Sequence, residues 1–293
     1  RNAVLNLMAE LLEQERASIK TVNKQDLNNY SGEDLAMEKR LLVDDSKIDG
    51  MILSMQQLAS QEDPVGVERF NFDHENGLKI INKTAAFGTI MIIYESRPDV
   101  TVEAGGIAFK SGNKILLKGG KESLLSNLKI VSLWHQALEE NNISKYWVEF
   151  LNYNREETQA FLEKPTQKVD LIIPRGGEQL IAFTKKHATC PVIVSGRGNN
   201  FVYVNKEADL QKALDIIING KTTNIGVCNA LDKVLIDSNL KNWQEFATKL
   251  VTELRNYHVE ILGDKIFSKA TNVPQIESDL IWYEEFLNYK IVI

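Results

Sequence analysis

Apolar residues recur at helical spacing through the first part of the chain. One helical pattern covers residues 2–30 and a second covers residues 33–59. Two strand-like runs follow, and they flank His74-Glu75-Asn76-Gly77, whose Asn-Gly pair favours a hairpin turn. The pattern therefore predicts a helical opening and then a small projecting hairpin at about residues 62–84.

From residue 89 onward, short apolar runs alternate with helical patterns. The apolar runs cover residues 89–94, 114–118, 170–173, 191–194 and 201–204, and the helical patterns cover 100–110, 122–138, 178–186 and 210–218. This alternation is typical of βαβ units, so we predict an α/β fold whose mostly parallel sheet has helices on both faces. A second α/β section has strand candidates at 233–236 and 258–262. We place the boundary between two domains within residues 205–230, giving domains of about 1–220 and 221–293.

Composition narrows the class of protein. A chain of 293 residues with 43% hydrophobic and 25% charged residues suits two globular lobes. The net charge of −6 lacks the basic excess that nucleic-acid binding needs, so we expect no nucleic-acid partner. No apolar run approaches the roughly 18 residues of a membrane helix, and the opening does not resemble a signal peptide. We therefore expect a cytoplasmic protein without a membrane partner.

The cysteines and the C-terminal end carry further information. Cys190 and Cys228 are too few for a secreted disulfide framework and lack the spacing of a zinc site, so we expect free thiols and no metal. The chain ends in an apolar run at residues 290–293 that looks like an interrupted strand. Because bare apolar strands seldom end proteins, we expect the chain to be part of something longer.

Four loops after the predicted strands combine glycine or proline with polar or charged side chains. Ligands of parallel α/β sheets bind at the carboxyl ends of the strands, where glycine lets a backbone come close and free N–H groups favour anions. Together the loops suggest a nucleotide or a phosphorylated substrate, although neither a GxGxxG nor a GxxxxGK[ST] motif occurs. The four loops cover residues 95–99, 118–121, 174–177 and 195–200.

Cys228 lies in a short polar break at residues 223–230, between a helical pattern and a strand candidate. Its local sequence leaves two interpretations open, a small buried residue or a reactive thiol. A reactive thiol with an ordinary pKa of about 8.5 would need a nearby cation or helix terminus to form the thiolate. For Cys190, which begins an apolar run, the structural interpretation is the stronger one.

Several sequence blocks resemble gamma-glutamyl phosphate reductases of the aldehyde dehydrogenase superfamily, in family order and with family-like spacing. The resemblance implies an aldehyde dehydrogenase-like fold, with a Rossmann-type cofactor domain and an α/β catalytic domain. It also implies glutamate-5-semialdehyde dehydrogenase activity, the NADPH-dependent reduction of L-glutamyl 5-phosphate to L-glutamate 5-semialdehyde with release of phosphate in proline biosynthesis. The main blocks are Tyr94-Glu95-Ser96-Arg97-Pro98-Asp99, Lys118-Gly119-Gly120-Lys121, Pro174-Arg175-Gly176-Gly177 and Gly226-Val227-Cys228-Asn229-Ala230.

The same resemblance assigns catalytic and substrate-binding residues. Cys228 matches the nucleophile that forms a thioester with the substrate, and Ser96 takes the place of the superfamily's oxyanion-hole asparagine. Val194 stands where hydrolytic relatives carry a glutamate that activates water, which fits a thioester that must survive until reduction. The candidates for binding the carboxylate or phosphate of the substrate are Arg97, Arg175 and Arg197.

Cofactor residues follow from the resemblance as well. The superfamily's Lys-Pro-x-Glu loop, which grips the adenosine ribose, corresponds here to Lys118-Gly119-Gly120-Lys121. Replacement of the carboxylate by Lys121 removes repulsion toward a 2′-phosphate, so NADP(H) is the expected cofactor. Glu285 matches the glutamate that binds the nicotinamide ribose. The remaining cofactor-binding candidates are Pro174, Gly176 and Gly177.

Three alternative functions stay open at the level of sequence. A CoA-dependent acylating aldehyde dehydrogenase would share Cys228 and the cofactor loops. The chain could also be the reductase half of a bifunctional kinase–reductase, or a catalytically silent scaffold of the same fold. The family further leads us to expect a homo-oligomer, and a small-molecule substrate as the binding partner.

Overall fold

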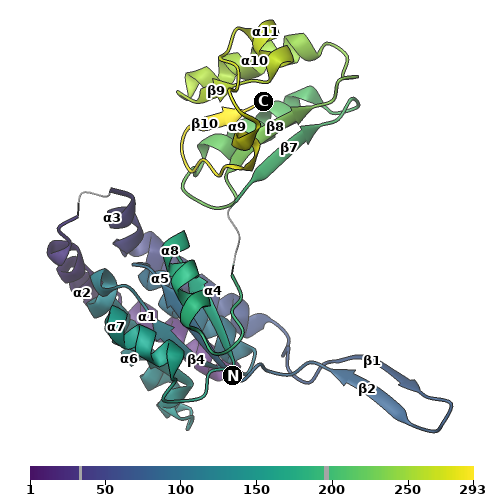
Figure 1. Cartoon of the computed structure of the whole chain (residues 1–293). Coiled ribbons are helices and arrows are strands. Elements are labelled where there is room, and N and C mark those ends of the chain that lie inside the picture. The colour runs from purple at the N-terminus through teal and green to yellow at the C-terminus, as the bar shows by residue number, and fades with distance from the viewer. Residues whose placement is uncertain (33–34, 195–197) are drawn as a thin grey trace. The chain divides into compact units, whose positions relative to one another are not determined.

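The computed structural model describes residues 1–32, 35–194 and 198–293, and the chain divides into two compact units, Arg1–Ser195 and Gly196–Ile293 (Figure 1). The division precedes the range 205–230 expected from the sequence. The physical reason is strand β7 (Asn200–Val204), which hydrogen-bonds along β8 (Leu231–Ile236) and so belongs to the second unit. The assignment of the cofactor and catalytic roles to separate domains stays a prediction.

The first unit opens with helices α1 (Asn2–Gln14), α2 (Arg16–Asn29), α3 (Leu35–Leu41) and α4 (Asp45–Ser60). Each of the two helical patterns expected from the sequence is thus divided into two helices. The second division is fixed by Asp44, whose side chain accepts the Lys47 N–H and so caps α4. Buried apolar side chains of α1 and α4 join the main core of this unit.

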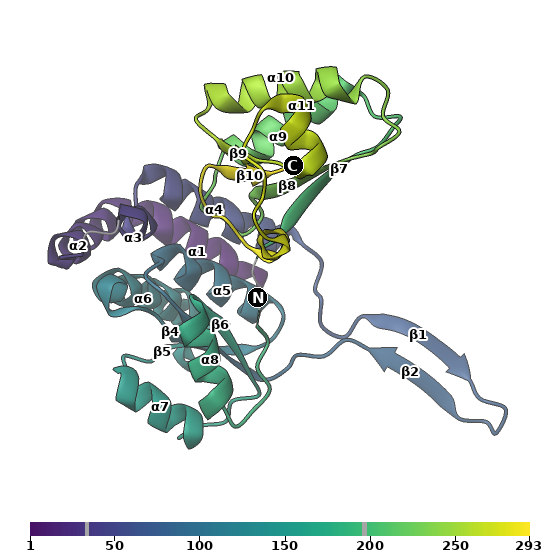
Figure 2. The same ribbon diagram turned by 45° about the horizontal axis from the view of Figure 1, so that its top comes forward.

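The predicted hairpin is confirmed by β1 (Glu68–Asp73) and β2 (Lys79–Lys83), which pair antiparallel. Gly77 in its turn has a φ of 88°, the left-handed conformation that glycine adopts without strain. Every residue of both strands is exposed, and the hairpin extends away from the helices of its unit in both views (Figures 1 and 2).

The sheet of the first unit is parallel, with the strand order β5 (Val148–Phe150), β4 (Lys114–Lys118), β3 (Thr89–Tyr94), β6 (Leu171–Arg175). The chain runs outward from β3 to β5 and then returns to β6 on the other side of β3. Such a reversal of strand order is where α/β sheets bind ligands. The strand expected at residues 191–194 is reduced to one bridge between Val192 and Ile172.

Alternate residues of this sheet enter two different cores. Leu117 packs in the core that includes α5 (Pro98–Lys110) and α6 (Leu124–Glu140), whereas Leu116 packs in the core that includes α7 (Arg155–Glu163) and reaches α8 (Glu178–His187). Because successive strand residues point to opposite faces, the sheet is covered by helices on both sides. The expected layered α/β arrangement is confirmed.

The second unit contains a parallel sheet with the order β7, β8, β10 (Lys290–Val292), β9 (Glu260–Leu262). Its helices are α9 (Leu210–Thr222), α10 (Trp243–Asn256) and α11 (Lys265–Thr271). The apolar run at the C-terminal end is therefore a strand between two neighbours, and its residues Ile291 and Val292 are fully buried. Within the part of the chain that the structure describes, no helix is long and apolar enough to cross a membrane.

Candidate active site

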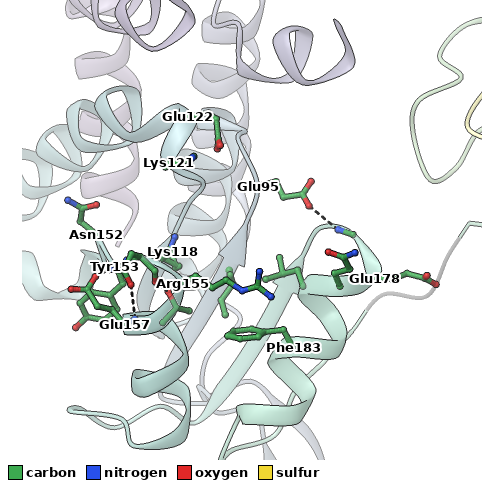
Figure 3. Close-up of a pocket in the computed structure, with 16 residues that line it drawn as sticks. Glu95, Lys118, Lys121, Glu122, Asn152, Tyr153, Arg155, Glu157, Glu178 and Phe183 are labelled. Atoms are coloured by element: carbon green, nitrogen blue, oxygen red, sulfur yellow. Dashed lines mark hydrogen bonds between the residues drawn. The ribbon is translucent and has the colours of Figure 1, made fainter. Parts of the chain in front are cut away.

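The loops that follow β3, β4, β5 and β6 gather at one edge of the first unit's sheet, because parallel strands end on the same side. They line a pocket of about 990 Å³ (Figure 3). Glu95 comes from the loop after β3, Lys118 from the end of β4, Lys121 from the segment after β4, and Gly177 from the start of α8. Three of the loops expected from the sequence therefore meet here.

The Lys118–Lys121 segment forms one wall of this pocket. Lys118 is half-buried, and its Nζ donates to the Gly119 carbonyl over 2.7 Å. Burial lowers the pKa of Lys118, and the nearby Glu122 carboxylate opposes that shift. A Cβ on Gly119 would press against the side chains of Tyr94 and Asn127, so glycine is required for the close packing of this loop.

Glu95 ties two loops of the pocket together. Its Oε1 accepts the backbone N–H of Gly177 over 3.0 Å, at the residue that caps α8 (Figure 3). A Cβ on Gly176 would lie 2.7 Å from the same oxygen. The predicted cofactor residues Gly176 and Gly177 thus lie against a carboxylate that already occupies one amide donor of the helix start. Pro174, two residues before Gly176, is buried in β6.

The wall of the pocket formed by Arg155 and Phe183 was missed by the sequence analysis. The Arg155 guanidinium carbon lies 5.6 Å from the centre of the Phe183 ring (Figure 3). Among the described residues, the Arg155 side chain makes no hydrogen bond or ion pair, so its positive charge is available to an anion. The signal that could have located it is the capping box of Asn154 and Glu157, because Asn154 directly precedes Arg155, the first residue of α7.

Ser96, the predicted oxyanion donor, is buried at 1% exposure. Its hydroxyl donates to Glu122 Oε2 over 2.8 Å, and a Cβ on Gly120 would lie 2.7 Å from its Oγ. Ser96 therefore joins the loop after β3 to the loop after β4. Its role toward an oxyanion stays a prediction, since its one proton is donated to a carboxylate here.

Arg97 and Arg175 lie near a common group of carboxylates. Arg97 pairs with Asp99 at 3.0 Å, and Asp99 Oδ1 is buried without a hydrogen-bond partner in the described residues. Burial and Asp99 raise the pKa of Glu103, whereas Arg97 and Arg175 act to lower it. Both predicted substrate cations are therefore within electrostatic range of Glu103. The third, Arg197, lies outside the described residues.

In the second unit, Cys228 is exposed in the turn between α9 and β8. Its carbonyl accepts the side-chain amide of Asn200 over 2.8 Å, and the same amide donates to Ala230 over 2.9 Å. Cys190 is half-buried, and burial, followed by the charge of Asp170, raises the pKa of its thiol. The more exposed thiol is thus the one that the family resemblance assigns as nucleophile.

Gly198 lies against both the Cys228 carbonyl and the Glu285 carboxylate. A Cβ at this glycine would overlap the Cys228 carbonyl oxygen and would lie 2.6 Å from Glu285 Oε1. The backbone of the predicted nucleophile and the carboxylate predicted to bind the nicotinamide ribose are therefore neighbours within one unit. Among the described residues, no cluster of His, Cys, Asp and Glu could hold a metal ion.

Comparison with known proteins decides the family. Residues 1–279 match the family model described as aldehyde dehydrogenase family. A gamma-glutamyl phosphate reductase from Clostridium botulinum (strain Eklund 17B / Type B) is 36% identical over 293 residues, covering 99% of this chain and 70% of the relative. The chain belongs to the gamma-glutamyl phosphate reductases of the aldehyde dehydrogenase family.

Solved structures agree with membership among the gamma-glutamyl phosphate reductases. The crystal structure of the Thermotoga maritima gamma-glutamyl phosphate reductase superposes with a TM-score of 0.89 at 37% identity, covering 99% of this chain and 70% of that chain. The expected aldehyde dehydrogenase-like fold is thus confirmed. A succinic semialdehyde dehydrogenase from Streptococcus pyogenes, solved with NADP+ as the cofactor, shares the fold at a TM-score of 0.60 and 14% identity, covering 89% of this chain and 54% of that chain.

Proposed function

We propose that this chain reduces L-glutamyl 5-phosphate to L-glutamate 5-semialdehyde with NADPH and releases phosphate, a step of proline biosynthesis. Membership of the reductase family supports the reaction. The observation that supports the mechanism is that the backbone of exposed Cys228 and the Glu285 carboxylate both approach the Cβ position of Gly198. A pocket and an exposed thiol thus accompany the family assignment.

Cys228 performs the covalent chemistry. Its thiolate attacks the acyl carbon of the substrate, so that a carbon–sulfur bond forms, the carbon–oxygen bond to phosphate breaks and phosphate leaves. A bound NADPH would supply the hydride that reduces the thioester. The resulting thiohemiacetal on Cys228 then collapses, releasing the aldehyde and restoring the thiolate. Val194, which stands where hydrolytic relatives carry a base, leaves the thioester without a carboxylate at that position to activate water.

The pocket of the first unit fits the adenosine half of NADPH. Its volume of about 990 Å³ lies at the upper end of the range of ligand pockets. Lys118, Lys121 and Arg155 supply cations for phosphates, and the Phe183 ring offers an apolar face. These groups support a preference for the 2′-phosphate of NADPH over the bare ribose of NADH. Glu285 would bind the nicotinamide ribose.

The substrate's anionic groups need cations and its oxyanion needs a donor. We assign the carboxylate and phosphate to Arg97, Arg175 and Arg197, since guanidinium groups match either anion with two hydrogen bonds. The Cys228 backbone N–H and the Ser96 hydroxyl are the proposed oxyanion donors. Ser96 would have to turn away from Glu122 to serve in this way.

The reaction can be tested in reverse, with glutamate 5-semialdehyde and NADP+ as substrates. We expect NADPH to accumulate only when inorganic phosphate is present, and CoA not to replace phosphate. Turnover that depends on CoA would instead identify a different acylating aldehyde dehydrogenase. Substitution C228A should abolish the reaction, whereas C190A, a change at the less exposed cysteine, should leave it intact.

Two further properties belong to this proposal. We infer a cytoplasmic location, where a biosynthetic reductase meets its substrate, and cell fractionation tests it. We also infer a homo-oligomer, in keeping with the exposed apolar side chains Phe70, Phe72 and Leu78 of the hairpin. Light scattering of the purified protein measures the oligomeric state, and a monomeric mass at micromolar concentration would contradict the inference.

A further inference from the structure

Strand β8 carries two adjacent charged residues that are both buried, Asp232 at 1% exposure and Lys233 at 0%. Adjacent strand residues point to opposite faces, so the two side chains leave β8 in different directions. Burying a charge is costly unless partners compensate for the lost water. The partners of these two residues lie on either side of Glu285.

Lys233 holds the residue before Glu285. Its Nζ donates to the carbonyl of Glu284 and to Asn199 Oδ1, the latter over 2.6 Å. The same ammonium lies 4.4 Å from the centre of the Phe286 ring, a cation–π contact. Lys233 therefore joins the segment that carries Glu285 to the segment that follows Gly198.

Asp232 holds the residue after Glu285. Its Oδ1 accepts the backbone N–H of Phe286 over 3.3 Å and lies 4.0 Å from Lys221 Nζ. Its Oδ2 has no hydrogen-bond partner among the described residues. The carbonyl that precedes Glu285 and the amide that follows it are thus both bound by side chains of neighbouring residues in one strand.

Asn199, the residue after Gly198, extends the contacts of Lys233. Asn199, which accepts from Lys233, donates through its own side-chain amide to the Trp282 carbonyl over 2.9 Å. Burial lowers the pKa of Lys233, and the carboxylates of Asp232, Glu284 and Glu285 oppose the shift. Glu285 is therefore within electrostatic range of the ammonium as well as being linked to it through the backbone.

We propose that Asp232 and Lys233 are positioning residues that fix the Glu285 carboxylate beside Gly198, in place to bind the ribose hydroxyls of the nicotinamide cofactor. The inference rests on the proposed role of Glu285. This role differs from a general contribution to core stability. Because Asp232 and Lys233 bind the backbone on both sides of Glu285, their effect on cofactor binding should pass through Glu285. Removal of Glu285 should therefore cancel the effect of removing Lys233.

A double-mutant cycle tests this coupling. The dissociation constant of NADPH is measured by fluorescence titration for wild type, K233M, E285Q and the double variant, together with the melting temperature of each. We expect each single variant to weaken binding about tenfold and the double variant to bind no more weakly than E285Q alone, within about twofold. K290M is the matched control, since Lys290 also lies by the Phe286 ring, at 5.3 Å, and should bind like wild type.

Each outcome of the cycle decides between explanations. If the fold-changes in the dissociation constant of the two single variants multiply in the double variant, Lys233 acts independently of Glu285 and the inference is overturned. If E285Q binds NADPH like wild type while K233M does not, both the inference and the assigned role of Glu285 fail. If both variants bind like wild type, Lys233 does not position Glu285 for binding and the inference also fails. A result that removes Glu285 from cofactor binding does not decide the reaction of Cys228, which is tested separately by the phosphate-dependent reduction of NADP+.

A second pair of variants covers the case in which K233M does not fold. D232N keeps an oxygen that can accept the Phe286 N–H, whereas D232A removes it. We expect D232A to weaken NADPH binding about tenfold and D232N to restore it to within about threefold of wild type. Equal NADPH binding by D232A and wild type, with both proteins folded, would contradict the positioning role of Asp232.

Discussion

The hydroxyl of Ser96 donates to Glu122 Oε2 over 2.8 Å, so the loop after β3 is fastened to the loop after β4 at the edge of the pocket. If Ser96 turns from this contact to the oxyanion during the reaction, S96A should lower kcat about 100-fold, in the range known for single oxyanion donors. Binding of NADPH should stay unchanged. E122Q, which keeps an acceptor oxygen, is the control, and S96A with full kcat would remove Ser96 from the mechanism.

Arg155 should contribute to the choice of cofactor. It faces the pocket without a polar partner in the described residues, so R155A should raise the KM for NADPH about tenfold, the value of one charge-assisted hydrogen bond. The KM for NADH should change little, because NADH lacks the 2′-phosphate. The nearby K164A, after the end of α7, serves as the control. A parallel rise for both cofactors would place Arg155 away from the 2′-phosphate.

Lys118 gives the cofactor site a dependence on pH. Its pKa is lowered from the ordinary 10.5, mainly by burial, so the ammonium is charged below that lowered value and loses its charge as the pH rises through it. We expect the KM for NADPH to rise at a more acidic pH than an ordinary lysine would cause. K118R should abolish the rise, because arginine stays charged throughout the range.

The control for this pH profile is K185R, at an exposed position on α8, which should leave it unchanged. An identical alkaline rise in K118R would show that another group titrates. The KM is best compared between about pH 7.5 and 10, above the second pKa of a phosphate near 6.

Gly198 should not tolerate a side chain. A Cβ there would overlap the Cys228 carbonyl and would lie 2.6 Å from Glu285 Oε1, so G198A must displace backbone or carboxylate. We expect G198A to lower kcat/KM at least about tenfold while the protein stays folded, since overpacking typically costs about 1–3 kcal/mol. G226A is the control, because a Cβ at Gly226 meets no atom within 4 Å. Wild-type activity of G198A would contradict the described packing.

The sequence predicted much of the fold because periodicity reports burial. The strand at residues 89–94 and the helix at 100–110 have strong apolar patterns, and both occur nearly as expected. The strand at 148–150 was missed because three residues are too short to show a period, and the helix after it was missed with it. Consequently Arg155, which lies between the missed strand and the rest of the missed helix, was absent from the expected site.

The site was predicted less completely than the fold, because contacts between distant residues leave no local pattern. The family blocks identified Cys228 and Glu285, yet nothing in the sequence shows that both residues lie against Gly198. Lys233 is the first residue of the predicted strand 233–236, and only the fold brings it to Glu284 and Asn199. The hydroxyl of Ser96 likewise required the structure to reveal its carboxylate partner.

The most direct test of the account is the formation of the thioester on Cys228. Glutamate 5-semialdehyde and NADP+ are mixed with the protein without phosphate, and the NADPH formed in the first turnover is measured together with the intact mass of the protein. We predict a burst of about one NADPH per active chain and a matching acyl adduct on wild type and C190A, discharged when phosphate is added. C228A should show neither burst nor adduct. A burst and turnover in C228A equal to those of wild type would contradict the account.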